Sequence, residues 1–350
     1  MTTTCRELPQ GSEAAWDAFI HAQPDATFFH RADWRQVITR AFGHRTHYLI
    51  AERDGAIVGV LPLCHIKSML FGQQLTSLPF CVYGGPLAID TEAFTALEAA
   101  SRQVMKQCGV SVMEWRPLAA LPDLAPEQNT AWQERSDLYV TFRSTMVADD
   151  ETNMKAIPRK QRAVVRKGIE RGLKSIADQN TTLLHRIYAE SVRNLGTPVF
   201  SRRYFEILAE VFAADLDIVT IFDGETAVAS VMNFYWRQEV IPYYGGGTLA
   251  ARSCFANDFM YWEVMRRAAA RGCTMFDFGR SKHGTGSFSF KKNWGFVPEP
   301  LRYRFCLAPG ARIPENNPLN PKYRLMIATW KRLPLPVANT IGPHIVRGVG

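Results

Sequence analysis

Residues 218–246 read IVTIFDGETAVASVMNFYWRQEVIPYYGG, and this stretch decides the fold. It holds three apolar runs rich in β-branched and aromatic residues, at 218–222, 227–236 and 239–245. Asp223-Gly224 separates the first two runs and Arg237-Gln238 the last two, which are connections of hairpin length. The stretch therefore predicts three consecutive antiparallel strands.

Helical patterns lie on both sides of these strands. Residues 183–195 and 202–212 have helical periodicity, and Ser201 is a suitable N-cap for the second of them. After the strands come a helix at 259–271, Gly272 as its C-cap and a returning strand at 274–279. The predicted order is two helices, three strands, a helix and a strand.

The first half of the chain repeats this order. Its Asp54-Gly55 turn, its Tyr83-Gly84-Gly85 element and its Gly109 correspond to Asp223-Gly224, Tyr244-Gly245-Gly246 and Gly272. The three pairs have nearly the same separation along the chain, which predicts two copies of one fold. In the first copy we expect helices at 13–23, 31–42 and 91–108, strands at 56–63 and 110–115, and a last strand at 138–144.

Composition and charge place few limits on function. The chain has 350 residues, 47% hydrophobic and 21% charged, which excludes a disordered, collagen-like or coiled-coil protein. The formal net charge is +8, with −5 in residues 1–150 and +13 in the rest. Such asymmetry is typical of a protein with an anionic partner, although a solvated basic surface would give the same count.

The stretch 155–174 joins the two copies and carries eight Lys or Arg residues against one acid. We predict one helix that starts near Ile157, with Pro158 in its first turn. Its cations are candidates for binding an anion such as tRNA, and a merely solvated basic helix fits equally well. The candidates are Arg159, Lys160, Arg162, Arg166 and Lys167.

Neither a disulfide framework nor a metal site is expected. The seven cysteines form no C-x-x-C pair and have no short spacing to histidine. No apolar run is long enough to span a bilayer and the N-terminus lacks the apolar core of a secretory signal, so we expect a cytoplasmic protein. The basic, Pro-rich tail 311–350 is either packed or in contact with the inner face of a membrane.

Four segments and the basic stretch resemble the FemAB-like family, whose members have two tandem GNAT-type acyltransferase domains. The segments are 26–34 (ATFFHRADW), 78–86 (LPFCVYGGP), 276–281 (FDFGRS) and 290–296 (FKKNWGF). The resemblance covers about residues 10 to 308 and is closest to the branch associated with exosortase and PEP-CTERM exopolysaccharide gene clusters. FemAB proteins transfer an amino acid from aminoacyl-tRNA to an amine of a peptidoglycan precursor.

The resemblance implies an α+β fold of two tandem GNAT-like domains, each a mixed, mostly antiparallel sheet flanked by helices. Residues 1–150 would form the acceptor side, 151–310 the donor and catalytic side, and 311–350 the tail. Substrate-binding candidates on the acceptor side are Trp34, Tyr83, Gly84 and Gly85.

Two loops of the second copy are candidates for holding an anionic donor. GNAT enzymes that use acetyl-CoA bind its pyrophosphate on a Q/R-x-x-G-x-G/A loop, which residues 245–256 (GGGTLAARSCFA) lack. Glycines and Arg252 at a helix N-terminus can still bind an anion. The second loop, 279–287 (GRSKHGTGS), fails the P-loop pattern but is an electropositive turn with Arg280, His283, Gly284 and Gly286.

The resemblance places a lysine near the transferred acyl group, where its ammonium offsets developing negative charge without acting as a base. Lys291 is the first choice and Lys292 the second, and the structural alternative is that both face solvent. As general base, Asp277, His283 and Tyr244 are candidates, each with an equally good structural interpretation.

These observations lead to an acyltransferase that transfers an aminoacyl group from aminoacyl-tRNA, or another acyl group, to an amine of a cell-envelope or exopolysaccharide precursor, with no bound cofactor. One alternative is an N-acyltransferase that uses acyl-CoA on a sugar amine. Another is a non-catalytic tandem-GNAT scaffold of the exopolysaccharide or exosortase machinery.

Overall fold

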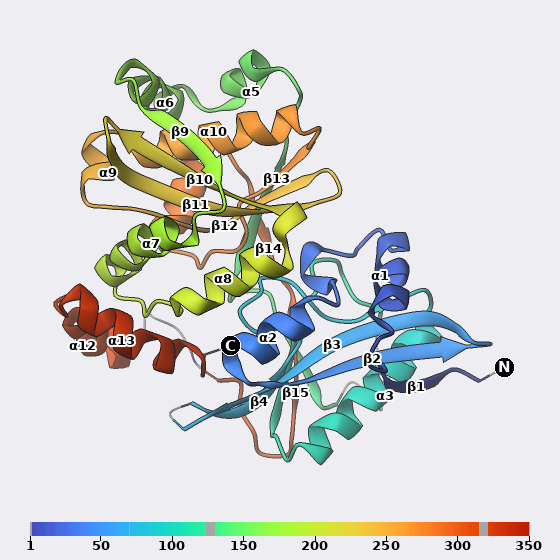
Figure 1. Cartoon of the computed structure of the whole chain (residues 1–350). Coiled ribbons are helices and arrows are strands. Elements are labelled where there is room, and N and C mark those ends of the chain that lie inside the picture. Colours follow the sequence, from blue (N-terminus) through green and yellow to red (C-terminus); the bar gives the residue numbers. More distant parts are fainter. Residues whose placement is uncertain (1, 70, 124–129, 315–320, 350) are drawn as a thin grey trace. The chain divides into compact units, whose positions relative to one another are not determined.

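The computed structural model describes residues 2–69, 71–123, 130–314 and 321–349 (Figure 1). The chain divides into two compact units. Unit 1 consists of Met1–Leu138, Leu301–Asn316 and Arg347–Gly350, and unit 2 of Tyr139–Pro300 and Asn317–Val346.

Unit 1 is built on a mixed sheet with the strand order β1-β2-β3-β4-β6-β15-β7, and β5 pairs with β3 outside this path. Its ladders are antiparallel except for the parallel pair β4–β6, and helix α3 (Thr91–Gln107) precedes β6. The strands are β1 (Thr4–Glu7), β2 (Arg45–Arg53), β3 (Ala56–Ser68), β4 (Gly72–Thr76), β5 (Leu87–Ala88), β6 (Val112–Trp115), β7 (Trp132–Arg135) and β15 (Tyr303–Leu307).

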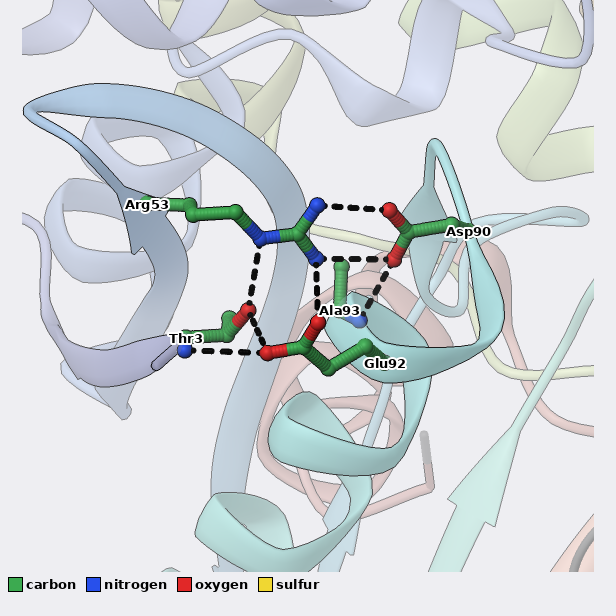
Figure 2. Close-up of polar contacts among 5 residues, drawn as sticks. All are labelled: Thr3, Arg53, Asp90, Glu92 and Ala93. Atoms are coloured by element: carbon green, nitrogen blue, oxygen red, sulfur yellow. Dashed lines mark hydrogen bonds and ion pairs between the residues drawn. The ribbon is translucent and has the colours of Figure 1, made fainter. Parts of the chain in front are cut away.

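A polar network fixes the edge of unit 1 where the β2–β3 turn meets the start of α3 (Figure 2). The Arg53 guanidinium contacts both Asp90 oxygens, at 2.8 and 3.1 Å, and donates to Thr3 Oγ1 at 3.0 Å. Asp90 is also the N-cap of α3, because its Oδ1 accepts from the backbone N–H of Ala93 at 2.9 Å. Glu92 binds the backbone and hydroxyl of Thr3, so one cluster joins β1, β2 and α3.

The remaining helices of unit 1 are α1 (Glu13–Ala22), the 3-10 turn η1 (Phe28–His30) and α2 (Trp34–Phe42). The loop between β4 and β5 is held by Arg116, which is buried and donates to the carbonyl oxygens of Leu78 and Cys81. Arg116 also forms a two-point ion pair with Glu114 on β6, with contacts of 3.1 and 2.9 Å.

Unit 2 is built on a sheet with the order β14-β8-β13-β12-β11-β10-β9, in which only β12–β13 is parallel. Figure 1 shows α7 and α8 on one face of this sheet and α10 with α6 on the other. The strands are β8 (Val140–Thr145), β9 (Lys174–Asp178), β10 (Leu216–Asp223), β11 (Thr226–Trp236), β12 (Glu239–Gly247), β13 (Met275–Asp277) and β14 (Pro298–Pro300). The helices are α5 (Asp150–Ala156), α6 (Arg159–Glu170), α7 (Thr181–Leu195), α8 (Arg202–Val211), η2 (Ala213–Asp215), α9 (Ala250–Ser253), α10 (Ala256–Ala270), α11 (Gly286–Asn293), α12 (Pro321–Trp330) and α13 (Leu335–Val346).

The repeat predicted from the sequence is confirmed in the topology. In each unit a meander of antiparallel strands is followed by a helix and one strand in parallel pairing, β4–β6 in unit 1 and β12–β13 in unit 2. Ser201 caps α8 as predicted, since its hydroxyl accepts from the N–H of Tyr204 at 3.2 Å.

Two details of the prediction are wrong. The strand expected to end the first copy at 138–144 is β8, which pairs with β13 and β14 of unit 2, while β15 joins the sheet of unit 1. The basic helix starts near the predicted position, since α6 begins at Arg159 just after Pro158, but it is shorter than the stretch 155–174. Ile157 is extended before Pro158, whose ring disfavours the helical conformation of the residue before it, so Lys155 belongs to α5, while Lys174 begins β9.

The tail packs against the fold where it is described. Trp330 is buried, and a Cβ on Gly196 at the end of α7 would lie 2.5 Å from Ile327 Cγ2 of α12. These contacts favour the packed interpretation of the tail, and a membrane contact stays a prediction. Among the described residues, the helices are too short or too polar to cross a bilayer.

Candidate active site

Strands β12 and β13 of unit 2 form only a short parallel ladder. The two strands pair at Glu239 with Met275 and Val240 with Phe276, whereas β12 continues to Gly247 and β13 ends at Asp277. The backbone of the second half of β12 therefore has no β13 partner among the described residues.

A groove of about 390 Å³ lies at the glycine-rich end of β12. It is lined by α7, the loop after β12, the start of α10 and Phe290 of α11, and its polar groups include Ser191, Asn194, Arg252 and Asn257. Only glycine fits at the groove floor. A Cβ on Gly246 would lie 2.5 Å from Ser191 Cβ, and one on Gly247 would lie 2.6 Å from Ala251 Cβ.

Aromatic rings separate this groove from the end of β13. Phe290 and Tyr261 both line the groove, and their ring centroids are 5.5 Å apart. Tyr261 also packs edge-on against Phe278, which directly follows β13, at 4.9 Å. Burial raises the pKa of Tyr261 to about 12, so its hydroxyl stays protonated at neutral pH.

Lys291 lies behind Phe290 on α11 and points at the end of β13. Its Nζ donates to the carbonyl oxygens of Gly279 and Arg280, both at 3.0 Å, and lies 5.7 Å from the ring centroid of Phe142 on β8. Burial lowers the pKa of Lys291 to about 7, the charge of Asp277 raises it, and that of Arg280 lowers it further. Near neutral pH the protonated and neutral forms of this amine are therefore present in comparable amounts.

Asp277 stabilises the turn after β13, whose carbonyl oxygens at Gly279 and Arg280 accept from Lys291. Its side chain is fully buried, and Oδ1 accepts from the N–H of Gly279 at 2.6 Å. Arg143 of β8 lies 3.4 Å from the other oxygen and also contacts Glu239. A carboxylate with these fixed partners is a positioning group for the turn.

Positive charge gathers around this turn. The Arg280 guanidinium lies 4.5 Å and the Lys282 ammonium 5.1 Å from the ring centroid of Tyr139, just before β8. Burial lowers the pKa of Lys282, and its interaction with Tyr139 opposes this effect. We call Lys291, Arg280, Lys282, Arg143 and Asp277 the lysine cluster.

Other candidates of the second copy lie outside the lysine cluster. Lys292 and His283 are exposed, and the His283 ring packs against Phe288 at 4.9 Å. Gly284 lies in an exposed turn, and Gly286 is the exposed first residue of α11, whose N-cap is Thr285.

Tyr244 lies in an aromatic cluster with α7 and α8. Its hydroxyl shares a 2.8 Å hydrogen bond with that of Tyr204, and burial raises its pKa well above the ordinary value. A phenol that is buried and so hard to ionise is a poor general base.

The acceptor-side candidates of unit 1 are part of its core. Trp34 is fully buried and its indole N–H donates to the carbonyl oxygen of Phe28 at 3.3 Å. Tyr83 is buried against Phe29, with ring centroids 5.9 Å apart. Gly84 fits because a Cβ there would overlap the carbonyl oxygen of Ser77, and Gly85 has a φ of +107°, which favours glycine.

Helix α6 presents the predicted basic surface. It packs on α10 through Val165 and Gly168, where a Cβ on Gly168 would lie 2.8 Å from Phe259 Cβ. The five predicted cations are exposed or half-buried, and none of them has a carboxylate in ion-pair range among the described residues. They are Arg159, Lys160, Arg162, Arg166 and Lys167.

Sequence reasoning missed the contribution of β8. Tyr139 and Phe142 contact the lysine cluster and Arg143 belongs to it, but their strand was assigned to the other copy. No local signal in residues 138–145 tells which sheet the strand joins. Asn257 was missed because its helix was predicted to start at 259, whereas α10 starts at Ala256, and Tyr261 was included in the predicted helix without a role in the site.

The comparisons with known proteins agree with this topology. Residues 155–292 match a family model described as an acetyltransferase (GNAT) domain. The structure is similar to that of FemX, with 14% identity, a TM-score of 0.67, and coverage of 92% of this chain and 99% of that one. No curated protein matches the sequence.

Two further solved structures cover nearly the whole chain. L-PGS from Bacillus licheniformis is 14% identical with a TM-score of 0.55, and the match covers 99% of this chain and 98% of that one. A tandem GNAT protein from the clavulanic acid biosynthesis pathway is 10% identical with a TM-score of 0.56, covering 89% and 100%. At these identities the likeness shows the fold, which is two tandem GNAT-type domains.

Proposed function

We propose that the chain is a GNAT-type acyltransferase that moves an aminoacyl group from aminoacyl-tRNA to an amine of a cell-envelope or exopolysaccharide precursor. The observation that carries the proposal is the environment of Lys291. This half-buried amine of α11 has a pKa of about 7 and points at the end of β13. It lies next to the turn that follows the short parallel ladder of β12 and β13, in a cluster of positive charge. Perturbed amines in such places are typical of catalytic sites.

The proposed reaction forms one bond and breaks one. The acceptor amine attacks the acyl carbonyl carbon, so a C–N bond forms, and the ester C–O bond to the donor breaks. An ammonium acceptor must first lose a proton, which neutral Lys291 accepts, and the neutral amine then attacks. As the C–N bond forms the nitrogen loses a second proton, and the departing oxygen of the tRNA takes up one proton and leaves as a hydroxyl. Arg280 and Lys282 offset negative charge that develops on the acyl oxygen.

This role differs in one respect from the expectation based on resemblance. There Lys291 acts only by its positive charge. A pKa of about 7 allows the same side chain to accept a proton as well, because about half of the molecules carry the neutral amine at pH 7.

Helix α6 supports aminoacyl-tRNA as the donor. Its five cations lie on an exposed face, and the helix contacts the start of α10, where Lys167 Nζ lies 5.3 Å from the ring centroid of Phe255. Asn257 and Met260, which line the groove, follow within the next turns of α10. Binding to phosphates through these cations predicts a steep fall in affinity with salt.

A second candidate function uses acyl-CoA on a sugar amine. It is favoured by the groove itself, which has about 390 Å³ of space and Arg252 at its edge. The lack of the usual pyrophosphate loop in residues 245–256 argues against it.

The deciding experiment offers both donors to the purified protein. Radiolabelled aminoacyl-tRNA and acetyl-CoA are each incubated with and without an extract of envelope precursors, and label in the precursor is measured. Transfer from aminoacyl-tRNA supports the first proposal, and transfer from acetyl-CoA alone refutes it in favour of the second. No transfer and no donor binding would favour a non-catalytic scaffold.

A matched pair of triple variants tests the role of α6. Replacing Arg159, Lys160 and Arg166 by Gln should weaken tRNA binding by tenfold or more and flatten its salt dependence. The control replaces Arg186, Arg202 and Arg203 on α7 and α8, which removes the same charge from the other face of the sheet. Equal losses in both variants would show that only net charge matters.

A further inference from the structure

Unit 1 contains a second pocket of about 390 Å³, independent of the function proposed for unit 2. It lies where β2 begins, β3 ends and α3 ends, next to Arg347. We call it the histidine pocket, and its polar lining includes His44, Arg45, His47, His65, Lys67 and Cys108.

Strand register brings these side chains to one face. Arg45 of β2 is directly opposite His65 of β3. His47 and Lys67 each follow at the next-but-one position of their strands, and alternate residues of a strand point to the same face. Cys108, just after α3, closes the pocket, and its Sγ lies 3.6 Å from His47 Nε2.

Arg347 completes the pocket wall. The Arg347 guanidinium donates to the carbonyl oxygen of Phe42 at 2.9 Å, and His44 Nε2 donates to the carbonyl oxygen of Arg347 at 2.7 Å. A Cβ on Gly348 would lie 2.7 Å from Ser68 Cβ, so the chain is closely packed here. These contacts hold a third cationic side chain beside Arg45 and Lys67.

The positive charges of the pocket are not neutralised within unit 1. Among the described residues, neither Arg45 nor Lys67 has a carboxylate in ion-pair range. Glu7 is the acid that reaches the pocket residues, and its Oε1 accepts from His47 Nδ1 at 2.5 Å. Burial lowers the pKa of His65, and the charges of Lys67, His47 and Arg45 lower it further.

This gathering of charge is not a property of the unit as a whole, since the segments of unit 1 together hold 15 Lys or Arg and 16 Asp or Glu residues, a net charge of −1. Like charges held together without partners repel one another, and a bound anion removes that repulsion. Arginine and histidine N–H groups are also directional donors to phosphate oxygens.

We propose that the histidine pocket binds the phosphate groups of a phosphorylated molecule, with a diphosphate as the best match. Three cations, Arg45, Lys67 and Arg347, balance the two or three negative charges of a diphosphate. The volume of about 390 Å³ exceeds the space that one phosphate group fills and is within the range of small-molecule sites.

Titration calorimetry on the full chain tests the proposal with inorganic pyrophosphate as the probe. The wild type should bind it, and the double variant R45Q/K67Q should bind at least tenfold more weakly, on the basis of two lost charge-assisted contacts. The control Arg312→Gln removes an exposed cation of the same unit outside the pocket and should change affinity less than twofold. Binding that is absent, or equal in all three proteins, overturns the proposal.

A second arm separates the two sources of phosphate. Vesicles of phosphatidylcholine with and without phosphatidic acid are floated with the same proteins. Pyrophosphate binding without flotation assigns the pocket to a free phosphorylated metabolite, and flotation that R45Q/K67Q abolishes assigns it to a lipid headgroup. Flotation that the double variant retains counts against the pocket.

Cysteine alkylation tests the same pocket without any substitution. Cys5 and Cys108 are half-buried, whereas the other five thiols are buried. Pyrophosphate should slow the reaction of Cys108 with N-ethylmaleimide severalfold and leave Cys5 unchanged, as read by mass spectrometry of the peptides. Equal rates at Cys108 with and without pyrophosphate contradict the proposal, even if the variants fail to fold.

Discussion

Lys291 makes a prediction that separates proton transfer from a purely electrostatic role. Its pKa is about 7 in the folded protein, whereas an exposed lysine of the unfolded chain has a pKa of about 10.4. Between these values the unfolded state binds more protons than the folded state. The free energy of unfolding must therefore rise with pH in this range, by at most about 1.4 kcal/mol per pH unit from this one group.

The perturbation is Lys291→Met, which removes the titrating group and keeps most of the side-chain volume. From pH 7 to pH 9 the wild type should gain about 2 kcal/mol relative to the variant. Urea unfolding at pH 7, 8 and 9 measures this difference, and other titrating groups cancel because both proteins carry them. Lys292→Met is the control, since Lys292 is exposed on the same helix and should give parallel curves.

Activity should follow the same titration. If neutral Lys291 accepts the proton of the acceptor amine, the transfer rate rises with pH through about 7 and then levels off. Parallel stability curves for wild type and Lys291→Met would mean that the amine stays charged, and they would refute proton transfer. A rate that falls through pH 7 would restore the purely electrostatic role.

The other predictions concern the groove floor and the N-cap of α3. Gly246→Ala should reduce stability by about 1–3 kcal/mol, because its Cβ meets Ser191, and should impair donor binding. Gly286→Ala, in open space, is the control for thermal unfolding. Asp90→Ala should cost about 1 kcal/mol through the lost cap. Hydrogen bonding to Arg53 lowers the pKa of Asp90 to about 2. The contribution of the Asp90 carboxylate to stability is therefore complete above pH 4 and disappears as the pH falls towards 2. If wild type and Asp90→Ala lose stability in parallel between pH 4 and pH 2, this prediction is contradicted.

Local chemistry explains how much of the fold could be predicted. Some features depend only on residues that are neighbours in the chain, so a single sequence predicts them. They include the turn at Asp223-Gly224, the N-cap Ser201 and the helix end at Cys108-Gly109. The sheet that β8 joins depends on β13 and β14, which lie in the distant last third of the chain. A short apolar strand fits either sheet equally well, and tertiary contacts determine which strands it pairs with.

The same distinction applies to the site. Lys291 was found because a family resemblance pointed to it, but its lowered pKa depends on burial by the surrounding fold. Trp34 and Tyr83 were taken for substrate-binding residues, and the structure buries both in the core of unit 1. A large aromatic side chain in a motif supports either interpretation, because packing and ligand binding use the same apolar surface.

Comparing the ends of the two parallel strands explains why unit 2 is the better candidate for catalysis. Glu114 and Asp277 have the same separation along the chain as the helix-ending glycines Gly109 and Gly272, so the two carboxylates are counterparts in the repeat. Glu114 of β6 forms an ion pair with Arg116, which directly follows the same strand, and the buried guanidinium occupies the space beyond the strand.

The residue that matches Arg116 in unit 2 is Gly279, which has no side chain. Its carbonyl oxygen accepts from Lys291, which α11 supplies, and the carboxylate of Asp277 contacts Arg143 of β8 instead. In unit 1 an internal ion pair therefore occupies the end of the strand, whereas in unit 2 the same place receives a titratable amine. Because an arginine stays protonated and a lysine with a pKa near 7 does not, only unit 2 has a group at this position that can exchange a proton with substrate.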